Sequence, residues 1–286
     1  MKTLALVTYK GLLELHDSDR LLIEPLTRAE FAVRIISWDE QIDWKQFDIV
    51  IIRSCWDYFT RISEFLEWLH LLEQQKIIVW NPLPILLWNY DKTYLKDLAG
   101  KGIATIPSVF LEQNSEHDLG HILEENAWDE AVVKPVVGGN AYGVFLVTRE
   151  QASVWQSKLD DLLRQSGVII QKFIKEVQAV GEFSIIFIGG EYSHTVCKKP
   201  NPGEFRSNID GKRTLELITL DDETLQQAAD VCQAVNGPLL YARVDGIKVG
   251  SIFMLMELEL LEPLLFFHLF PQGAEIFAHA VKKLSQ

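Results

Sequence analysis

The stretch 237–263 contains two β-like runs that carry acidic residues where the core of a sheet normally has apolar ones. A turn is expected near Gly250, between the two runs, so the stretch is predicted to form a hairpin. Asp245 lies in the first run, and Glu257 and Glu259 share one face of the second because side chains alternate along a strand. The hairpin is therefore predicted to bring three carboxylates together at the same end of two adjacent strands.

Three neighbouring carboxylates repel one another unless a cation lies between them. Hard oxygen ligands with no His or Cys nearby suit Mg²⁺, and Mg²⁺ is commonly bound together with nucleotide phosphates. The hairpin thus predicts a Mg²⁺ site formed by Asp245, Glu257 and Glu259. The alternative is an edge hairpin whose acidic side chains simply face water.

The composition limits the class of protein. With 286 residues, 48% hydrophobic and 23% charged, the chain is expected to be globular with a sizeable core. Its net charge of −13 argues against nucleic acid or an anionic membrane surface as the main partner. The three cysteines, Cys55, Cys197 and Cys232, are far apart and form no metal-binding spacing, which predicts a reducing, cytoplasmic location. No stretch is apolar enough to predict a transmembrane span, and the first residues read as a buried strand.

The chain divides into three segments of different character. Strand-like and helix-like patterns alternate over residues 1–88, which predicts an α/β segment with a parallel sheet, and the Asn81-Pro82-Leu83-Pro84 run is expected to end it. A second segment is expected at 89–167 and a strand-rich third one at 168–286. Helices are expected, among other places, at 19–32, 62–75, 221–235 (capped by Asp221) and 273–284.

A lysine and a glycine-rich loop follow one another in the second segment. Lys134 ends an apolar strand, and Gly138, Gly139 and Asn140 open a loop that closes at Gly143. Glycines let a loop approach a phosphate with its N–H groups, and the lysine supplies a positive charge. An ordinary hairpin turn with a surface lysine is the alternative. The spacings of a P-loop and of a dinucleotide-binding fold are both absent.

Two further stretches have the character of a base pocket. Gln171-Lys172-Phe173-Ile174 ends one strand and provides backbone groups and apolar walls. Glu182 begins the next strand and has the chemistry to bind ribose hydroxyls. Two core strands with a charged edge are the alternative.

Cationic side chains are scarce in this acidic chain, yet several cluster near the hairpin. Lys198 and Arg206, with Asn208, flank a loop, and Arg243 lies two residues before Asp245 and so on its face. Arg206 or Arg243 would clamp a transferring phosphoryl group and stabilise its developing charge. The alternative for each arginine is a salt bridge to a nearby acid.

The substrate candidates follow a strand of the first segment. In open α/β sheets, ligands bind beyond the carboxyl ends of the strands. Arg53 would there pair with a substrate carboxylate, and Trp56, Asp57 and Tyr58 would line the site. Alternatively, Arg53 pairs with Asp57 and the rings cap the sheet.

Taken in order, these motifs resemble the ATP-grasp superfamily, including its RimK-type and glutathione-synthetase-like members. The stretch Phe205-Arg206-Ser207-Asn208 is similar to one in RimK-type glutamate ligases. The stretches 53–58 and 256–263 look closest to the group that contains the cycloserine-ring-forming ligase. The motifs that carry the resemblance are Asn89-Tyr90-Asp91-Lys92, Val133-Lys134-Pro135, the 138–143 loop, 171–174, Gly181-Glu182, 205–208, Arg243-x-Asp245 and Glu257-x-Glu259.

The resemblance implies an ADP-forming ligase that uses ATP and Mg²⁺ to join a small carboxylate to an amine through an acyl phosphate, with ring closure in one version. The three segments would be a pre-ATP-grasp domain, a lid subdomain and a C-terminal subdomain that holds the Mg²⁺ site. The implied ATP-binding residues are Lys92, Lys134, Gly138, Gly139, Asn140, Gln171, Lys172, Phe173, Ile174, Glu182 and Lys198. The implied catalytic residues are Arg206, Asn208 and Arg243.

This chain departs from the superfamily at two positions, which often hold Asn where Glu259 stands and an acidic residue where Lys172 stands. Two other functions remain open: an ATP-binding module without chemistry, and a kinase-like phosphotransferase. The complete set of Asp245, Glu257, Glu259 and Arg206 favours the ligase, because a degenerate module is expected to have lost a member. A homodimer is common among similar ligases, but no segment marks an interface.

Replacing Arg206 by Ala is expected to lower kcat more than it weakens ATP binding. The physical reason is that the guanidinium is assigned to charge that develops during phosphoryl transfer. Steady-state kinetics of ADP release and a separate ATP titration measure the two quantities. An unchanged kcat would remove Arg206 from the catalytic group.

Overall fold

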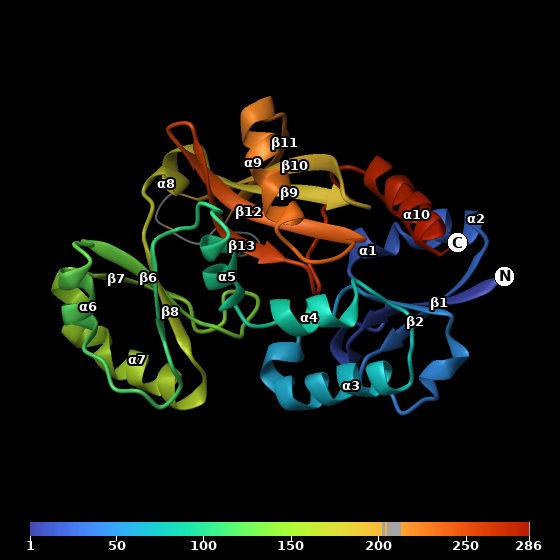
Figure 1. Cartoon of the computed structure of the whole chain (residues 1–286), viewed down its shortest axis with the longest axis horizontal. Helices are drawn as coiled ribbons and strands as arrows, with labels where there is room; N and C mark the ends of the chain where they lie inside the picture. The colour runs from blue at the N-terminus through green and yellow to red at the C-terminus, as the bar shows by residue number, and fades with distance from the viewer. Residues whose placement is uncertain (202–203, 205–212, 286) are drawn as a thin grey trace.

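The computed structural model describes residues 1–201, 204 and 213–285, which form three sheets (Figure 1). The first sheet is parallel, in the order β2-β1-β3-β4, as the alternating pattern of residues 1–88 predicted. Its strands are almost entirely apolar because helices and the third sheet cover them. The elements are β1 (Lys2–Thr8), α1 (Asp17–Arg20), α2 (Ile23–Arg28), β2 (Phe31–Ser37), β3 (Ile49–Ile52), α3 (Ile62–Gln74) and β4 (Val79–Trp80).

The second sheet is antiparallel, in the order β5-β8-β6-β7, with α6 and α7 packed on it through an apolar core. We expected the strand at 168 to open the third segment. It pairs instead with β5 and β6, so this sheet continues to Lys172 rather than ending at 167. Its elements are β5 (Ser108–Leu111), α6 (Leu119–Glu125), β6 (Glu130–Pro135), β7 (Phe145–Thr148), α7 (Ala152–Gln165) and β8 (Val168–Lys172).

The third sheet is also antiparallel, in the order β11-β10-β9-β12-β13. The predicted hairpin is confirmed: β12 and β13 pair, and Gly250 takes a positive φ of 63° at their turn. The Asp221 side chain accepts a hydrogen bond from the Thr224 N–H at 3.0 Å and caps α9, as expected. The elements are α8 (Glu176–Val180), β9 (Glu182–Ile188), β10 (Glu191–Pro200), β11 (Arg213–Ile218), α9 (Asp222–Gln233), β12 (Tyr241–Val249), β13 (Ile252–Glu259) and α10 (Gln272–Leu284).

Prolines explain two differences from the expected helices. The helix predicted at 19–32 is broken into α1 and α2, and β2 already begins at Phe31. Pro25 has no N–H to bond the Leu21 carbonyl, so a helix cannot run continuously through this point. Conversely, the proline-rich run at 81–84 starts a helix, α4 (Leu83–Asn89), because Pro84 lies in its first turn, where no N–H is needed. After α4, α5 (Tyr94–Gly100) follows.

Buried polar contacts join the first sheet to the third. The Tyr241 hydroxyl donates to the Ile52 carbonyl at 2.8 Å and lies 3.0 Å from the Leu261 carbonyl. The Asn81 amide donates to the Tyr241 and Leu260 carbonyls at 2.9 and 2.8 Å. α10, close to the amino terminus in Figure 1, packs against α2 and completes the apolar core shared by these layers. In the part of the chain that the structure describes, no helix is long and apolar enough to cross a bilayer.

Replacing Tyr241 by Phe is expected to lower the free energy of unfolding by about 1–3 kcal/mol, because buried carbonyls of Ile52 and Leu261 lose a hydroxyl partner while the ring packing is kept. Urea unfolding followed by tryptophan fluorescence measures this change. Equal stability of the variant and the unmodified protein would show that this bond does not hold the sheets together.

Candidate active site

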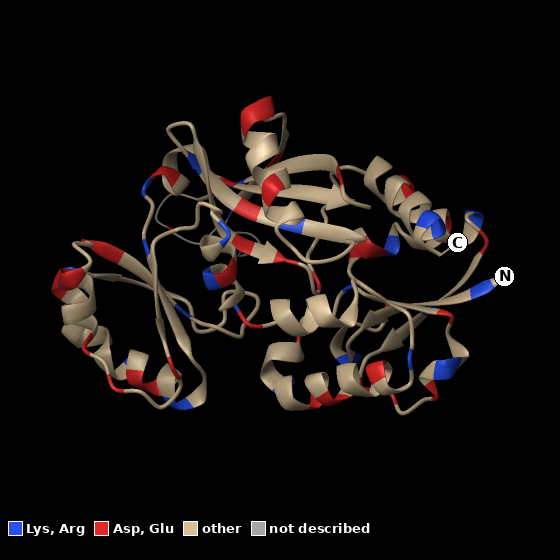
Figure 2. Ribbon diagram, in the orientation of Figure 1, with Lys and Arg blue, Asp and Glu red and all other residues tan. Residues whose placement is uncertain are grey.

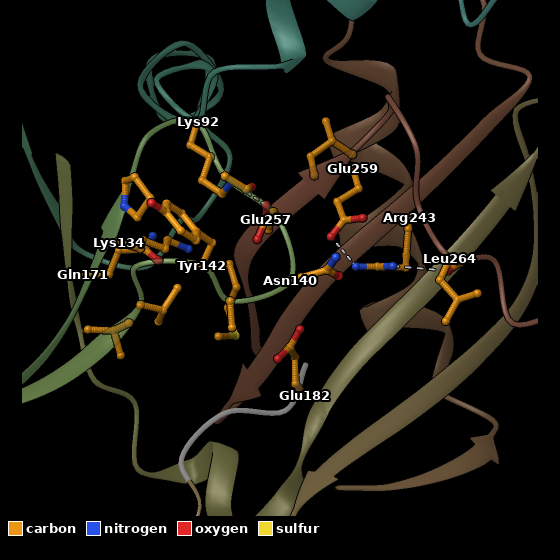
Figure 3. A pocket seen from close by; sticks show the side chains of 18 of the residues that line it. Lys92, Lys134, Asn140, Tyr142, Gln171, Glu182, Arg243, Glu257, Glu259 and Leu264 are labelled. Carbon is orange, nitrogen blue, oxygen red and sulfur yellow. Dashed lines mark hydrogen bonds and ion pairs between the residues drawn. The ribbon is translucent and has the colours of Figure 1, made fainter. Parts of the chain in front are cut away.

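A pocket lies where the three sheets meet, and Figure 3 shows it from close by. The first sheet contributes the segment after β3, the second sheet contributes β6, β8 and the loop after β6, and the third contributes β9, β10, β12 and β13. The structure gathers most of the sequence-predicted site residues here: Trp56, Tyr58, Lys92, Lys134, Gly138, Gly139, Asn140, Gln171, Lys172, Phe173, Ile174, Glu182, Lys198, Arg243, Glu257 and Glu259 all line it.

The hairpin register places the charged residues of β12 opposite those of β13, with two acidic residues at one position and an arginine and an acidic residue at the other. Asp245 pairs with Glu257 and Arg243 pairs with Glu259 across β12 and β13. Figure 2 shows that charged positions gather on these two strands in the interior of the molecule. Glu257 and Glu259 line the pocket and are partly exposed to it, as the alternation of side chains predicted.

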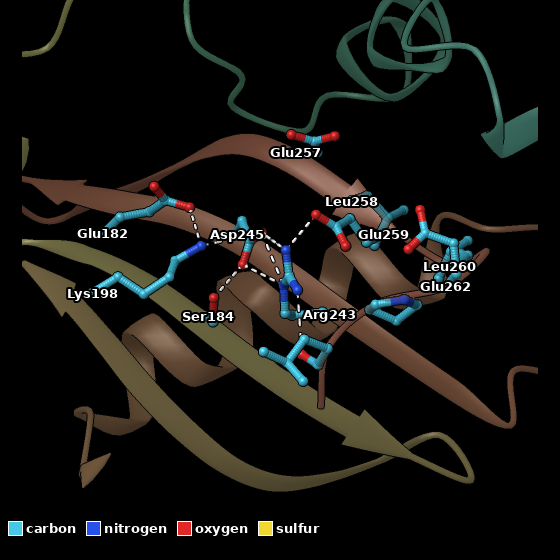
Figure 4. Close-up of polar contacts among 12 residues, drawn as sticks. Glu182, Ser184, Lys198, Arg243, Asp245, Glu257, Leu258, Glu259, Leu260 and Glu262 are labelled. Atoms are coloured by element: carbon cyan, nitrogen blue, oxygen red, sulfur yellow. Dashed lines mark hydrogen bonds and ion pairs between the residues drawn. The ribbon is translucent and has the colours of Figure 1, made fainter. Parts of the chain in front are cut away.

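Asp245, by contrast, is 1% exposed and is held by cations below the pocket lining. The Arg243 Nε and Nη2 atoms donate to its two carboxylate oxygens at 3.0 and 2.8 Å, and Ser184 donates from its hydroxyl. The Lys198 Nζ lies 3.5 Å from Asp245 and 2.5 Å from Glu182. Arg243 also donates to Glu259, so a continuous chain of ion pairs runs through the sheet (Figure 4).

Burial and neighbouring charges shift the pKa values of the site carboxyls in different directions. Burial, together with the charges of Asp245 and Glu257, raises the pKa of Glu259 to about 7 even though Arg243 opposes the shift. Burial and the charge of Glu259 also raise the pKa of Glu262 well above its usual range. The pKa of Glu257 is lowered, because Lys92 and Lys134 outweigh the effect of burial. A divalent cation in this place would favour the ionised form of all three.

The lysines and the glycine loop lie at one end of the pocket. The Lys92 Nζ is 3.2 Å from a Glu257 oxygen and donates to the Gly138 carbonyl at 2.7 Å, which ties the loop to the hairpin. Burial lowers the pKa of Lys134, which lies at the end of β6. Asn140 and the neighbouring Ala141 take positive φ angles of 50° and 57°, so the loop turns sharply.

The residues expected around the base also line the pocket. Gln171 is buried, and its side-chain amide donates to the Ser108 hydroxyl at 3.0 Å. Lys172, whose assignment the superfamily pattern left open, has an exposed side chain at the end of β8, beside Phe173 and Ile174. Glu182 begins β9 and is paired with Lys198.

Two of the substrate candidates do not reach the pocket. Arg53 is fully buried; it forms an ion pair with Asp19 at 3.0 Å and donates to the Pro263 carbonyl at 2.6 Å. Its burial and its pair with Asp19 favour the alternative of an internal salt bridge, with Asp19 in place of the expected Asp57. Its expected alternative partner, Asp57, accepts a hydrogen bond from Trp38 Nε1 at 2.8 Å and is likewise outside the pocket lining. Arg206 and Asn208 lie outside the described residues.

The pocket contains residues that sequence reasoning did not assign. Asn89, at the end of α4, belongs to the quoted Asn89–Lys92 motif, and Glu262 follows the predicted hairpin directly, so their positions were a usable signal. His16 and Tyr142 gave no such signal. The His16 ring packs against the Trp56 ring with 5.0 Å between their centroids. The Tyr142 ring packs against the Phe59 ring of the first segment with 5.4 Å between their centroids.

The pocket offers the oxygen ligands that Mg²⁺ prefers. In the ranges 1–201, 204 and 213–285, no group of three or more His, Cys, Asp or Glu residues is arranged to hold a metal ion by itself. Mg²⁺, however, is usually bound by one or two carboxylates together with water and substrate phosphates. Glu257 and Glu259 lie side by side on the pocket face of β13 and meet that requirement. Asp245 would bind the metal only if its hydrogen bonds to Arg243 were broken.

The fold is that of an ATP-grasp ligase, and the ATP-grasp fold implies that the protein binds ATP. Two family descriptions match the chain: the N-terminal domain of D-cycloserine synthetase DcsG at residues 4–81 and the RimK-like ATP-grasp domain at residues 91–261. The chain belongs to the RimK-like ATP-grasp family. The resemblance inferred from the sequence motifs is therefore confirmed.

Relatives of known name are similar to this chain over different shares of its length. The cycloserine biosynthesis protein DcsG of Streptomyces lavendulae is 28% identical over 296 residues, which cover 98% of each chain. A probable alpha-L-glutamate ligase of Aeromonas salmonicida is 25% identical over 141 residues, covering 44% of this chain and 46% of the relative.

Solved structures share the fold over the whole chain. The crystal structure of D-cycloserine synthetase DcsG superposes with a TM-score of 0.88 and 26% identity, covering 99% of this chain and 100% of the other. The D-alanine–D-alanine ligase from Bacillus anthracis, complexed with ATP, superposes with a TM-score of 0.71 over 100% and 97% of the chains. At 18% identity, this second likeness shows the fold alone.

The raised pKa of Glu259 predicts a pH-dependent stability. Between about pH 4.5 and pH 7 the folded protein keeps a proton that the unfolded chain releases, so the contribution of Glu259 to the free energy of unfolding falls as the pH rises. Replacing Glu259 by Gln removes this loss. The stability of the variant relative to the unmodified protein is therefore expected to be greater at pH 8 than at pH 5, measured by urea unfolding with a chelator present. A pH-independent difference would contradict the shift.

Proposed function

We propose that this enzyme is an ATP- and Mg²⁺-dependent carboxylate–amine ligase that acts through an acyl phosphate on a small, amino-acid-like substrate. The observation that carries the proposal is the arrangement of the pocket: two lysines and a glycine loop adjoin a pair of carboxylates, and beyond these lies a second region with its own polar groups. Phosphoryl transfer needs this combination of positive charge, a metal and a covering loop more than it needs a covalent nucleophile.

On this proposal, one end of the pocket would provide a residue for each part of ATP. Lys92 and Lys134 would neutralise phosphate oxygens, and the backbone of the Gly138–Gly143 loop would cover them. Gln171 to Ile174 would flank the adenine, and Glu182 would bind the ribose hydroxyls. Lys92 already holds the Gly138 carbonyl, so the loop and the phosphate-binding lysine form one unit.

Glu257 and Glu259 would hold the metal ion on the pocket face of β13. A Mg²⁺ ion held there would supply positive charge to offset the negative charge that develops on the phosphate oxygens. The Arg243 guanidinium lines the pocket next to Glu259 and would stabilise the same developing charge. Its ion pair with Asp245 fixes the guanidinium plane, so Asp245 orients Arg243 whether or not it also binds metal.

The proposed reaction has two steps. An oxygen of the substrate carboxylate attacks the γ-phosphorus of ATP, and the bond to the bridging oxygen breaks to release ADP and form an acyl phosphate. The amine nitrogen then attacks the acyl carbon; the bond from that carbon to the phosphate oxygen breaks, inorganic phosphate leaves and the nitrogen loses a proton to solvent. If acid and amine belong to one molecule, the product is a ring. The full-length likeness to a cycloserine biosynthesis protein supports this ring-forming version.

The region of the pocket beyond Arg243 suits a small polar substrate. Trp56 and Phe266 provide apolar walls, and Glu262 provides a carboxyl group whose ionised form a substrate ammonium group would favour. The His16 Nδ1 accepts a hydrogen bond from the Ser18 N–H at 3.2 Å, so the neutral ring carries its proton on Nε2 and has a donor to offer.

Replacing Glu257 by Gln is expected to abolish turnover, because one metal ligand and the partner of Lys92 are lost together. The measurement is Mg²⁺-dependent release of ADP from ATP in the presence of pooled amino acids, dipeptides and small carboxylic acids. Release that requires an acid together with an amine, on one molecule or on two, would establish the ligase.

The same assay separates the other functions. Release with a single acceptor and a phosphorylated product would indicate a kinase-like phosphotransferase. ATP binding without release would indicate a non-catalytic module, and near-normal turnover of Glu257→Gln would refute the metal assignment. Glu216→Gln is the matched control, because Glu216 lies on β11 and outside the pocket lining.

A further inference from the structure

β13 lies at the edge of the third sheet. β13 is the last strand of its sheet, so one of its edges has no neighbouring strand. In an antiparallel ladder alternate residues point their backbone groups to opposite edges, and unpaired buried groups are costly. Leu255, earlier in β13, bonds the backbone of Ala104 and Ile106. At the end of the strand the outward backbone groups belong to Leu258 and Leu260, which lie on either side of Glu259.

Side chains from the segment 81–94 take the place of the missing strand. The Asn89 amide nitrogen donates to the Leu258 carbonyl, and its oxygen accepts from the Leu260 N–H, both at 2.8 Å. The Tyr94 hydroxyl accepts from the Leu258 N–H, and the Asn81 amide donates to the Leu260 carbonyl, again at 2.8 Å. All four outward groups therefore have a partner.

Asn89 holds a special place among these contacts. One amide bonds the residue before Glu259 and the residue after it, as a peptide group of a neighbouring strand would. The donor and acceptor pattern also fixes which way the amide points, because a flipped amide would set its oxygen against the Leu258 carbonyl. Asn89 is 6% exposed, so water does not readily replace it.

The hydrogen bonds from Asn89 are linked to which side chains of β13 face the pocket. Leu258 and Leu260 are buried in the apolar core below the strand, so Glu257 and Glu259 must face the pocket. Asn89 holds the backbone on both sides of Glu259. Lys92, three residues after Asn89, holds the Glu257 carboxylate. One short segment thus orients both carboxylates.

We propose that Asn89 is a positioning residue that holds the backbone around Glu259 so that Glu257 and Glu259 bind a divalent cation together. This inference rests on the proposed function, because it takes the two glutamates as metal ligands. Groups that orient metal ligands without touching the metal typically change metal affinity by about 10–100-fold when they are replaced.

The test uses Mn²⁺ as the probe, because Mn²⁺ accepts the same oxygen ligands and its free form is measured by electron paramagnetic resonance. The full-length protein is titrated with Mn²⁺ in the presence of ATP and without an acid substrate. Asn89→Asp keeps the size of the side chain but loses the donor to the Leu258 carbonyl, and Asn89→Ala loses both bonds. We expect each variant to bind Mn²⁺ about tenfold more weakly, with a smaller change in ATP affinity.

Two further variants make the result decisive. Tyr241→Phe removes buried hydrogen bonds between the sheets without touching Leu258 or Leu260, so it should lower stability and leave Mn²⁺ affinity unchanged. Glu259→Gln removes the proposed ligand itself and should weaken Mn²⁺ binding. If Glu259→Gln weakens binding and both Asn89 variants do not, the positioning role is wrong and the metal site stands. If Glu259→Gln has no effect, the proposed metal site fails and the role of Asn89 fails with it.

Discussion

The compensation of closely spaced carboxylates by neighbouring cations is the interaction on which this site depends. Asp245, Glu257, Glu259 and Glu182 lie within one hairpin and its neighbouring strand, where their mutual repulsion and loss of hydration are unfavourable. Arg243, Lys198 and Lys92 offset that cost, and they come from β12, β10 and the segment between α4 and α5. Each of these cations compensates a carboxylate on the hairpin or on β9, so the elements that supply the cations are coupled through the site.

The coupling extends to the backbone. β13 carries the two pocket-facing glutamates at the edge of its sheet, and an edge strand has backbone groups to satisfy. The polar side chains of segment 81–94 meet that need and at the same time fix which face of the strand is turned to the pocket. The contact between Tyr142 of the glycine loop and Phe59 adds a link between this loop and the first segment. A Cβ at Gly139 would lie 3.2 Å from the Phe59 ring, so the close approach of loop and ring uses a glycine.

Local patterns were sufficient for much of the fold and for much of the pocket. The strands of the first sheet, the β12–β13 hairpin, its shared glutamate face and the cap at Asp221 each follow from side chains a few residues apart. Arg53 could not be placed in this way. It has an attractive position after a strand, but its partner Asp19 is 34 residues away in the chain and its second partner, the Pro263 carbonyl, is 210 residues away. The sequence also contained two signals that the expected helix boundaries ignored. Pro25 interrupts the helix expected at 19–32, and Pro84 is typical of the first turn of a helix.

The sequence by itself determined the alternation of strands and helices, the residue types able to bind phosphate and metal, and their order along the chain, because these depend on side-chain chemistry and on the period of the backbone. The tertiary structure decided which of those groups share a pocket. It buried Arg53 and Asp245 in ion pairs, moved β8 into the second sheet, and brought Asn89 against β13. Those outcomes depend on desolvation and on hydrogen bonds between groups up to 210 residues apart, and no local pattern contains that information.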